Sequence, residues 1–345
     1  MKKTSLKDIA ENLNVSKTLV SFVLNGQGDS KGISSETQKK VLDKVKELNY
    51  KPNQIARGLR LGKSLTIGLI VADISNKFYA KIAKQIEKVA STYNYNVIFC
   101  SSDENPEKEI ELIDMLKDRQ VDGIIISTTQ KRTAVFTQLK KEKYPFVLID
   151  RHLPKLSTNF VGVDNYTGAF EATEHLIRNG FERIAFFMIS PNYLSTMKER
   201  EAGYRNALKY NGIRVNNHLI RTISFQDIRE NVRSYLSELM KSPFHIDALF
   251  SGNNNISVAI MEYLNDMNLR IPNDLALVSF DDIDLFRFSH PSITAVSQPL
   301  DRIGEMAVNI LMDEINGLTK DSTQLALAVK FIERKSSSVL IQQMV

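Results

Sequence analysis

The sequence predicts an α/β fold preceded by a small helical segment. From residue 65 onward, apolar runs typical of strands alternate with amphipathic helices, and this alternation restarts after residue 163. Such alternation is typical of parallel, doubly wound sheets covered by helices on both faces, and two series predict two lobes. Before residue 65 the apolar residues repeat only at helical spacing. The composition, with 43% hydrophobic and 25% charged residues among 345, is that of a globular chain and excludes collagen-like, low-complexity and disulfide-scaffold proteins.

Two short helices open the chain. The first is expected over 5–13, where Ser5 is the N-cap and Asp8, three residues later, is placed as in a capping box. The second is expected over 17–25, with Ser16 as its N-cap. Because a turn of about three residues joins them, the pair matches a helix-turn-helix.

A third helix is expected over 35–49, after a glycine-rich loop, with Ser34 or Ser35 as its cap. Its apolar stripe is Val41, Leu42, Val45 and Leu48. The following segment, 50–64, has room for about two helical turns interrupted by Gly58, and an isolated helix of that length is marginal in water. We therefore expect a linker that becomes helical only when it is docked.

The remaining elements follow from hydrophobic patterning. The first series has strand-like runs LTIGLIVA, YNVIFC, DGIIIS and FVLID, with helices expected over 78–93, 106–119 and 131–142. The second series has runs RIAFFMI, LIRTIS, DALFSG and LALVSF, with helices expected over 165–179, 197–211, 227–241 and 255–268. A helix over 300–317 and a last strand around 325–334 could complete either lobe.

The charge is concentrated at one end of the chain. Residues 1–64 contain 13 basic and 6 acidic residues, a net charge of +7, whereas the remainder carries −2. This asymmetry indicates a contact with nucleic acid or an anionic surface. No apolar run approaches the ~20 residues of a membrane span, and no apolar core follows the N-terminal lysines as in a secretory signal. We expect a cytoplasmic protein with no membrane partner.

A search for catalytic and metal-binding motifs is empty. The five histidines lack metal-ligand spacing, and G-x-S-x-G, P-loop and H-E-x-x-H patterns are missing. The single cysteine, Cys100, excludes an intramolecular disulfide and is expected to be a buried strand residue. Asp281, Asp282 and Asp284 follow a strand, where they favour a polar pocket edge over a metal site. We expect no enzyme activity, no catalytic residue, no metal and no cofactor.

The sequence contains stronger candidates for DNA-binding residues than for catalytic residues. The second helix of a helix-turn-helix lies in the major groove with its N-terminal residues at the base edges, here Lys17, Thr18, Ser21 and Phe22. Lysine and hydroxyl side chains can donate to bases or phosphates. Phe22 can contact a thymine methyl group, and the alternative is that it packs against the third helix.

These segments carry a family resemblance. The runs SLKDIAENLNVSKTLVSFVLNG and SSETQKKVLDKVKELNYKPNQIARGLRLGKS, followed by TIGLIVADISNKFYAKI, VDGIIIS, VSFDDIDL, HPSITAVSQP and IERKSS, closely resemble the LacI/GalR family of bacterial transcriptional repressors over the whole chain. The first 60 residues are the most specific part of this resemblance.

The resemblance implies a domain organisation. Residues 1–50 would form a helix-turn-helix DNA-binding headpiece, 51–63 a hinge helix, and 64–345 an effector-binding and dimerisation domain similar to periplasmic binding proteins. The chain would cross three times between an N-lobe, made of 64–162 and 292–322, and a C-lobe, made of 163–291 and 323–345.

The resemblance also implies a function. The chain would be a ligand-responsive repressor that binds a pseudo-palindromic operator as a homodimer, with a small polar effector, such as a sugar, in the cleft between the lobes. An alternative is a regulator in which a corepressor or partner protein tightens DNA binding. A DNA-binding enzyme and an exported sugar-binding protein are disfavoured by the empty catalytic search and by the missing signal sequence.

Site residues follow by motif match. The residues expected to contact DNA are Ser5, Leu6, Ser16, Lys17, Thr18, Ser21, Phe22, Asn25, Lys31, Thr37, Tyr50, Asn53, Ala56, Arg57 and Leu59. Leu59 would be the wedge inserted into the minor groove, lined by Ala56 and Arg57. The residues expected to bind the ligand are Asp73, Asn76, Phe78 and Tyr79 on one side of the cleft, and Asp150, Arg151, Arg200, Asn253 and Asp281 across it.

Three residues or segments depart from the family pattern. Phe22 replaces a common arginine, so we expect the operator to carry an A·T pair where relatives read G·C. The loop after the second helix is about three residues longer than usual and contains Lys31. Asn254 stands where relatives usually carry aspartate. Because no leucine heptads follow the final strand, a dimer rather than a coiled-coil tetramer is expected.

Overall fold

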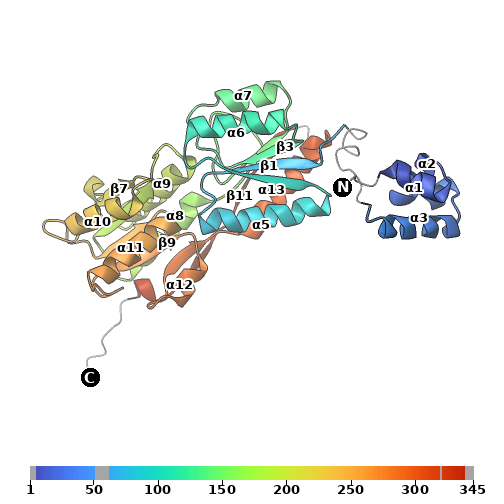
Figure 1. Cartoon of the computed structure of the whole chain (residues 1–345). Coiled ribbons are helices and arrows are strands. Elements are labelled where there is room, and N and C mark those ends of the chain that lie inside the picture. Colours follow the sequence, from blue (N-terminus) through green and yellow to red (C-terminus); the bar gives the residue numbers. More distant parts are fainter. Residues whose placement is uncertain (1–4, 51–61, 319–320, 339–345) are drawn as a thin grey trace. The chain divides into compact units, whose positions relative to one another are not determined.

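The computed structural model describes residues 5–50, 62–318 and 321–338, and the chain divides into two compact units, Met1–Ser64 and Leu65–Val345. Figure 1 shows the first as a helical unit and the second as an α/β unit built around two sheets. Among the described residues, no helix is long and apolar enough to cross a membrane.

The first unit, the headpiece, contains three α-helices: α1 (Leu6–Leu13), α2 (Lys17–Leu24) and α3 (Ser35–Glu47), with a short 3-10 turn at Asp29–Lys31. The predicted capping box is present, because the Asp8 N–H donates to Ser5 Oγ (3.3 Å) and the Ser5 N–H donates to Asp8 Oδ2 (2.7 Å). Ser16 caps α2 and Ser34 caps α3. A small core holds the three helices together: Ile9, Ala10, Val20, Val23 and Val41.

Two details of the headpiece differ from expectation. The helix α3 ends at Glu47 rather than at residue 49, and Leu48 is its C-cap. Leu42, expected in the buried stripe, is 44% exposed because its neighbour Val41 occupies the inward position on the helix. The stripe therefore consists of Val41, with Val45 and Leu48 partly buried beside it.

The first sheet of the second unit is wholly parallel. Its strands are β1 (Thr66–Val71), β2 (Asn96–Ser101), β3 (Gly123–Ile126), β4 (Phe146–Ile149), β5 (Phe160–Val163) and β11 (Gln324–Leu327), in the spatial order β11-β5-β4-β3-β1-β2. The helices α5 (Lys77–Thr92) and α13 (Leu300–Ile315) cover one face, and α6 (Pro106–Asp118) and α7 (Ala134–Lys141) cover the other (Figure 1). We call this half the first lobe.

The second sheet repeats the same order of its first five strands. Its strands are β6 (Ile184–Ile189), β7 (Ile220–Ile223), β8 (Ala248–Ser251), β9 (Ala276–Phe280), β10 (Thr294–Ser297) and β12 (Lys330–Ile332), in the order β12-β10-β9-β8-β6-β7. Its helices are α8 (Asn165–Arg178), α9 (Ser195–Tyr210), α10 (Ile228–Leu239), α11 (Asn254–Asp266) and the short α12 (Asp284–Phe288). This half is the second lobe, and only β12 runs antiparallel to its neighbour.

The helices α8 and α9 pack unusually closely. A Cβ atom on Gly203 would lie 2.4 Å from the carbonyl oxygen of Tyr166, so only glycine allows this approach. This close pair covers one face of the second sheet and fixes the N-terminal part of α9, which carries cleft residues.

Two predicted lobe boundaries are wrong. The strand at 294–297, expected in the first lobe, pairs with β9 in the second sheet. The strand at 324–327, expected in the second lobe, pairs with β5 in the first sheet. The single last strand expected over 325–334 is two strands, one in each sheet. The chain crosses between the lobes three times, and the later two crossings are at about 298 and 328. They lie there because β10 is next to the edge of the second sheet and β11 is at the edge of the first.

Candidate functional site

A cavity lies between the two lobes, at the carboxyl ends of the parallel strands. Ligands bind there in open α/β sheets. All nine residues predicted to bind the ligand line this cavity: Asp73, Asn76, Phe78, Tyr79, Asp150, Arg151, Arg200, Asn253 and Asp281. The predicted arrangement across the cleft needs one correction. Asp150 and Arg151 follow β4 and so belong to the first lobe with Asp73, not to the opposite side.

The two lobes each contribute an aspartate from the end of their fourth strand. Asp150 follows β4 with φ of 62°, and Asp281 follows β9 with φ of 72°. Aspartate is among the few residue types that adopt this left-handed conformation readily. Tyr79 Oη donates to Asp150 Oδ2 (2.9 Å), and Gln298 Nε2 donates to Asp281 Oδ1 (2.6 Å). Burial raises the pKa of Asp281, an effect that Arg200 and Gln298 partly offset.

Arg200, on α9, is the centre of the second lobe's side of the cavity. Its guanidinium lies 3.6 Å from the ring centroid of Phe280 and is 97% removed from solvent. Its Nε donates to Asn165 Oδ1 (2.8 Å), and its Nη1 donates to the Gly252 carbonyl (2.7 Å). Burial lowers the pKa of Arg200, although Asp281 and Asp150 oppose that shift. The side chain is therefore a rigid donor that is held in place before any ligand arrives.

Arg151 is committed to a partner inside the protein. It donates to both carboxylate oxygens of Glu104, at 2.7 and 2.5 Å, and both side chains are almost fully buried. Burial opposes its charge, but Glu104, Tyr79 and Asp150 hold the pKa of Arg151 well above its usual value. Such bidentate pairs are strong, so Glu104 balances the charge of Arg151. The Arg151 guanidinium therefore gives the cavity a polar wall but little net positive charge.

The cavity is rich in acceptors. Four carboxylates line it, those of Asp73, Glu104, Asp150 and Asp281, against the two guanidinium groups of Arg151 and Arg200. In addition, Gln298 Oε1 in the lining is buried and receives no hydrogen bond from the described parts of the chain. The arrangement suits a ligand that donates several hydrogen bonds and carries no negative charge.

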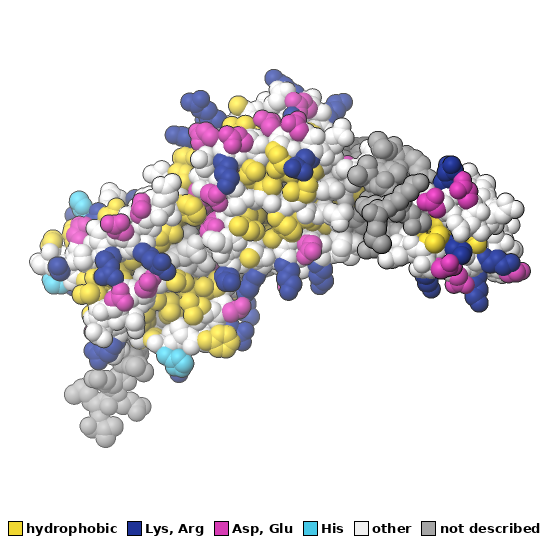
Figure 2. Space-filling model, viewed as in Figure 1, with side chains coloured by type: hydrophobic (Ala, Val, Ile, Leu, Met, Phe, Trp, Pro, Cys, Tyr) yellow, Lys and Arg dark blue, Asp and Glu magenta, His cyan; other side chains and the backbone are white. Residues whose placement is uncertain are grey.

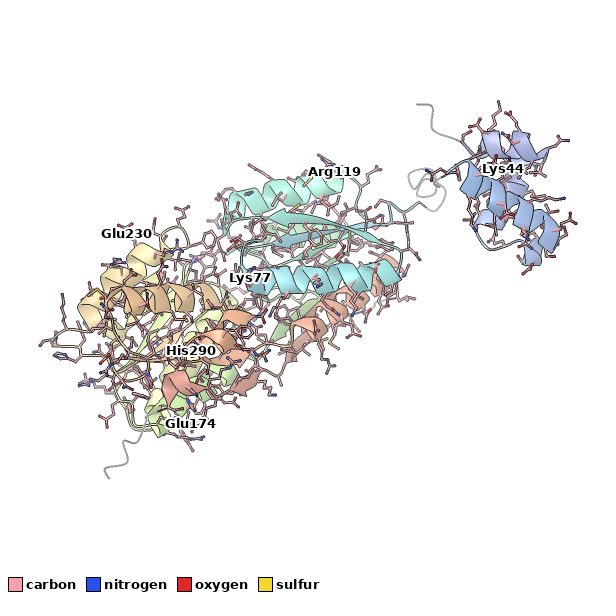
Figure 3. The ribbon with its side chains drawn as sticks, turned by 60° about the horizontal axis from the view of Figure 1, so that its bottom comes forward. Lys44, Lys77, Arg119, Glu174, Glu230 and His290 are labelled. Atoms are coloured by element: carbon pink, nitrogen blue, oxygen red, sulfur yellow. The ribbon has the colours of Figure 1, made fainter. Side chains whose placement is uncertain are left out.

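The lobes are closed around this cavity, which encloses only about 30 Å³, room for one or two water molecules. Polar contacts join the lobes around it. Tyr193 Oη donates to the Thr129 carbonyl (2.9 Å), the His152 N–H donates to Ser195 Oγ (3.0 Å), and Asn254 Nδ2 donates to Asn76 Oδ1 (3.0 Å). At the rim, Lys81 on α5 pairs with Asp284 on α12 (3.1 Å). Figure 3 shows Lys77 at the end of α5 that faces the second lobe.

Several predicted ligand residues also stabilise helix ends. Asn76 Oδ1 accepts from the Phe78 N–H (3.0 Å) at the start of α5, and Asn253 Oδ1 accepts from the Ile256 N–H (2.9 Å) at the start of α11. Asp73 Oδ1 accepts from both the N–H and the hydroxyl of Ser75. These bonds fix the loops at the mouth of the cavity.

Sequence reasoning missed seven residues of the lining: Glu104, Ile189, Thr196, Met197, Phe225, Asn255 and Gln298. Their common feature is position, because most follow a strand or begin a helix at the same end of a sheet. Counting residues from each strand end could have found Glu104 after β2 and Gln298 after β10. Such counting does not reveal that Glu104 pairs with Arg151, because the two residues lie 47 positions apart in sequence.

The acidic triplet after β9 does not form a metal site. Asp281 faces the cavity, Asp282 pairs with Arg334 (2.8 Å), and Asp284 pairs with Lys81. Among the described residues, no group of histidine, cysteine and acidic side chains could hold a metal ion. Cys100 lies in β2, as expected, and is only partly buried.

The headpiece presents a polar face on α2. Lys17, Thr18 and Asn25 are exposed and Ser21 is half-buried, whereas Val20 and Val23 face the core. Asn25 Nδ2 donates to the Ser21 carbonyl (2.8 Å), which orients the amide. Phe22 is half-exposed and is not a member of the headpiece core, so the alternative of packing against α3 is not what the structure shows.

The other predicted DNA-contact residues are distributed around this face. Ser5 and Ser16 are N-caps, Leu6 and Tyr50 pack against the core, and Thr37 lies 2.9 Å from Ser34 in the first turn of α3. The predicted hinge residues lie outside the described part of the chain: Asn53, Ala56, Arg57 and Leu59.

Comparison with known proteins matches both units of the chain. Residues 5–53 match the family described as bacterial regulatory proteins, lacI family, and residues 64–335 match periplasmic binding proteins and sugar binding domain of LacI family. The HTH-type transcriptional regulator RegA of Clostridium saccharobutylicum is 32% identical over 336 residues, which cover 97% of this chain and 99% of RegA.

Two solved structures are similar over nearly the whole chain. The transcriptional regulator CelR–cellobiose complex is 26% identical, has a TM-score of 0.71, and is matched over 97% of this chain and 100% of that one. The lac repressor dimer bound to operator and an anti-inducer is 22% identical, has a TM-score of 0.82, and is matched over 98% and 100%, which shows the shared fold. The chain is a transcriptional repressor with a DNA-binding headpiece and a ligand-binding domain, not an enzyme, and it belongs to the LacI family.

Proposed function

We propose that this repressor binds a pseudo-palindromic operator as a homodimer and that a small, uncharged polyhydroxyl compound, such as a sugar, binds between the lobes and changes operator affinity. The observation that carries this proposal is the closed interlobe cavity, in which Asp150 and Asp281 face Arg200. We place its action in the cytoplasm, where bacterial operator DNA lies.

The chemistry of the cavity supports a sugar. Carboxylates accept hydrogen bonds from neighbouring hydroxyl groups, and Arg200 can donate to a ring oxygen or hydroxyl. The aromatic side chains of Phe78 and Phe225 in the lining can cover an apolar C–H face. CelR, a relative of known structure, is described in complex with cellobiose.

Effector binding must change the lobe angle. The cavity of about 30 Å³ is smaller than any sugar, which occupies several times the volume of a water molecule. Entry therefore requires opening, and opening breaks the contacts of Tyr193 with Thr129 and of Asn254 with Asn76. An effector and the operator that prefer different lobe angles are coupled by ~1–3 kcal/mol, and the coupling is reciprocal.

The exposed apolar surface supports a dimer. Phe99 lies on the edge strand β2 and is 43% exposed, and Ile110 on α6 and Ile74 after β1 are similarly exposed. Figure 2 shows apolar side chains gathered between α5 and α6 and again over α11. An exposed edge strand with apolar neighbours is an incompletely buried surface that a second copy can cover. We expect the mass of a dimer at micromolar concentration, and a tetramer would contradict this assignment.

The reading face of α2 supports a specific operator. Lys17 and Thr18 can donate to base edges, and the half-exposed ring of Phe22 is suited to a thymine methyl group. We predict an A·T pair opposite Phe22. In vitro selection of sites by the purified protein checks this, and a G·C pair at that position would refute it.

The test of the whole proposal is binding of genomic fragments by the purified protein at 0.15 M salt, repeated with a panel of sugars and nucleosides. One palindromic site whose affinity is shifted by one compound supports the proposal. A compound that weakens binding is an inducer, and one that tightens it is a corepressor. Binding that is only non-specific and falls steeply with salt would refute the proposal.

A further inference from the structure

An exposed cation lies over a partly buried aromatic ring on the face predicted to contact DNA. Lys31 Nζ is 5.4 Å from the ring centroid of Phe22, within the range of a cation–π contact. Phe22 belongs to α2, whereas Lys31 ends the 3-10 turn nine residues later. Neither side chain belongs to the headpiece core.

Side-chain hydrogen bonds from α3 hold the loop that carries Lys31 in place. Gln38 of α3 reaches into it, and its Nε2 donates to Asp29 Oδ1 (2.8 Å) and to the Ile33 carbonyl (2.8 Å). Gly28 is buried against Gln38, and a Cβ atom there would lie 2.3 Å from Gln38 Cδ.

Backbone bonds close the loop at both ends. The Gln27 N–H donates to the Phe22 carbonyl (2.9 Å), and the Lys31 N–H donates to the Gln27 carbonyl (3.1 Å). The Ile33 N–H donates to the Gly28 carbonyl (2.9 Å). Because the loop is tied to α2 and α3 together, the fold places the backbone of Lys31 near Phe22, and the cation–π contact with the ring orients the lysine side chain.

We propose that Phe22 and Lys31 act as one specificity-determining unit, which rests on the proposed DNA-binding function of α2. The ring of Phe22 contacts a thymine methyl group, and the ammonium of Lys31, held over that ring, donates to the acceptor atoms of the adjacent base pair. Guanine O6 and N7 are the acceptors that lysine reads in the major groove. The unit thus reads two adjacent base pairs, a thymine-containing pair and a G·C pair.

The two side chains depend on each other in this arrangement. Without the ring, the flexible lysine stem is no longer held at the base edge, and its three donors can reach phosphate instead. Without the ammonium, the ring keeps its methyl contact but the neighbouring base pair is no longer read. Gln38 is a positioning residue, because it contacts the loop and not the DNA-reading side chains.

The experiment is in vitro selection of operator sites by the full-length protein, followed by binding to the selected palindrome and to its single-base-pair substitutions. The variants are Phe22→Leu, Lys31→Met and the double variant. Lys40→Met is the matched control, since it removes the same charge from an exposed lysine that pairs with Glu36 (2.7 Å).

We expect each single variant to lose roughly 5- to 150-fold in preference at the adjacent G·C pair, the range of one good base contact. The double variant should lose no more at that pair than the worse single variant. Gln38→Ala should weaken the same preference, and Lys40→Met should lower affinity evenly across all sequences. Thermal unfolding of each variant separates loss of contact from loss of fold.

Three results would overturn the inference. Unchanged base preference in Lys31→Met, or losses at the G·C pair that multiply in the double variant, would show that the two side chains act independently. A loss in Lys31→Met that is even across sequences would show a phosphate contact only. If the wild-type protein selects no palindrome at all, the proposed DNA-binding function fails first and this inference fails with it.

Discussion

The acceptor-rich cavity predicts discrimination against negatively charged effectors. The charge of Arg151 is matched by Glu104, and Arg200 faces the remaining three carboxylates, those of Asp73, Asp150 and Asp281. Two negative charges are therefore uncompensated when all groups are ionised. A phosphorylated or carboxylated sugar would bring a further negative charge into a cavity from which water is largely excluded.

The size of this effect follows from Coulomb's law. At about 6 Å and an effective dielectric constant of about 20, one uncompensated carboxylate repels a unit negative charge by about 3 kcal/mol. We count only one of the two excess charges, so this value is a lower bound. A difference of about 3 kcal/mol is roughly 100-fold in the dissociation constant.

The assay is isothermal titration calorimetry with the neutral sugar identified in the ligand panel, its phosphate ester, its uronic acid and its amino derivative. We expect the two anionic forms to bind at least roughly 100-fold more weakly and the amino form to bind no more weakly than the neutral sugar. Asp281→Asn keeps an oxygen that can accept from Gln298, and it should reduce the difference in affinity between the neutral and anionic forms. An anionic form that binds as tightly as the neutral sugar would refute the electrostatic reasoning.

Two predictions concern stability. Glu109 is fully buried and accepts from the Thr128 hydroxyl (2.7 Å) and the Thr129 N–H (2.6 Å), and burial raises its pKa in the folded state. Its contribution to the free energy of unfolding is therefore fully present below the unfolded pKa of about 4.3 and is lost as pH rises through the folded pKa. Urea unfolding followed by circular dichroism should show that, above about pH 4.5, the free energy of unfolding falls less steeply with pH in Glu109→Gln than in the wild type. If the two proteins lost stability with pH in parallel, Glu109 would not be the cause. Gly203→Ala places a methyl group 2.4 Å from the Tyr166 carbonyl and should destabilise the effector domain by about 1–3 kcal/mol. A melting temperature equal to that of the wild type would show that α8 and α9 separate freely.

Local features of the fold were predictable because they depend on short-range chemistry. Ser5 with Asp8 specified the start of α1 through a capping box, and Ser16 specified the start of α2. The run IAFFMI in β6 is apolar and buried at every position, a pattern typical of strands that are covered on both faces. The residues lining the cavity came from the family resemblance, since no local pattern distinguishes Asp281 from its neighbour Asp282.

Features that depend on long-range pairing were not predictable. The strands β10 and β11 are both four residues long, and nothing in their composition indicates which sheet each one joins. Their hydrogen-bonding partners, β9 and β5, decide this, and those lie 14 or more residues away. For the same reason, nothing in the sequence near Arg151 indicates that this predicted ligand residue pairs with Glu104. The exposure of Phe22 also depends on how the loop before α3 closes.

The closed cavity is close to energetic balance, as a switch requires. The polar contacts that stabilise closure include three interlobe hydrogen bonds worth about 1 kcal/mol each, the ion pair of Lys81 with Asp284 worth less than 1 kcal/mol, and the approach of His152 Nε2 to Glu199 Oε1 (3.7 Å). Closure is opposed by two buried oxygens, Asn254 Oδ1 and Gln298 Oε1, which receive no donor from the described residues and cost about 1–3 kcal/mol each. Because these contributions are of similar size, a ligand that prefers one lobe angle can change the populations of the open and closed forms with little binding energy. A ligand that binds the open and closed forms equally well would bind without regulating, however tightly it binds.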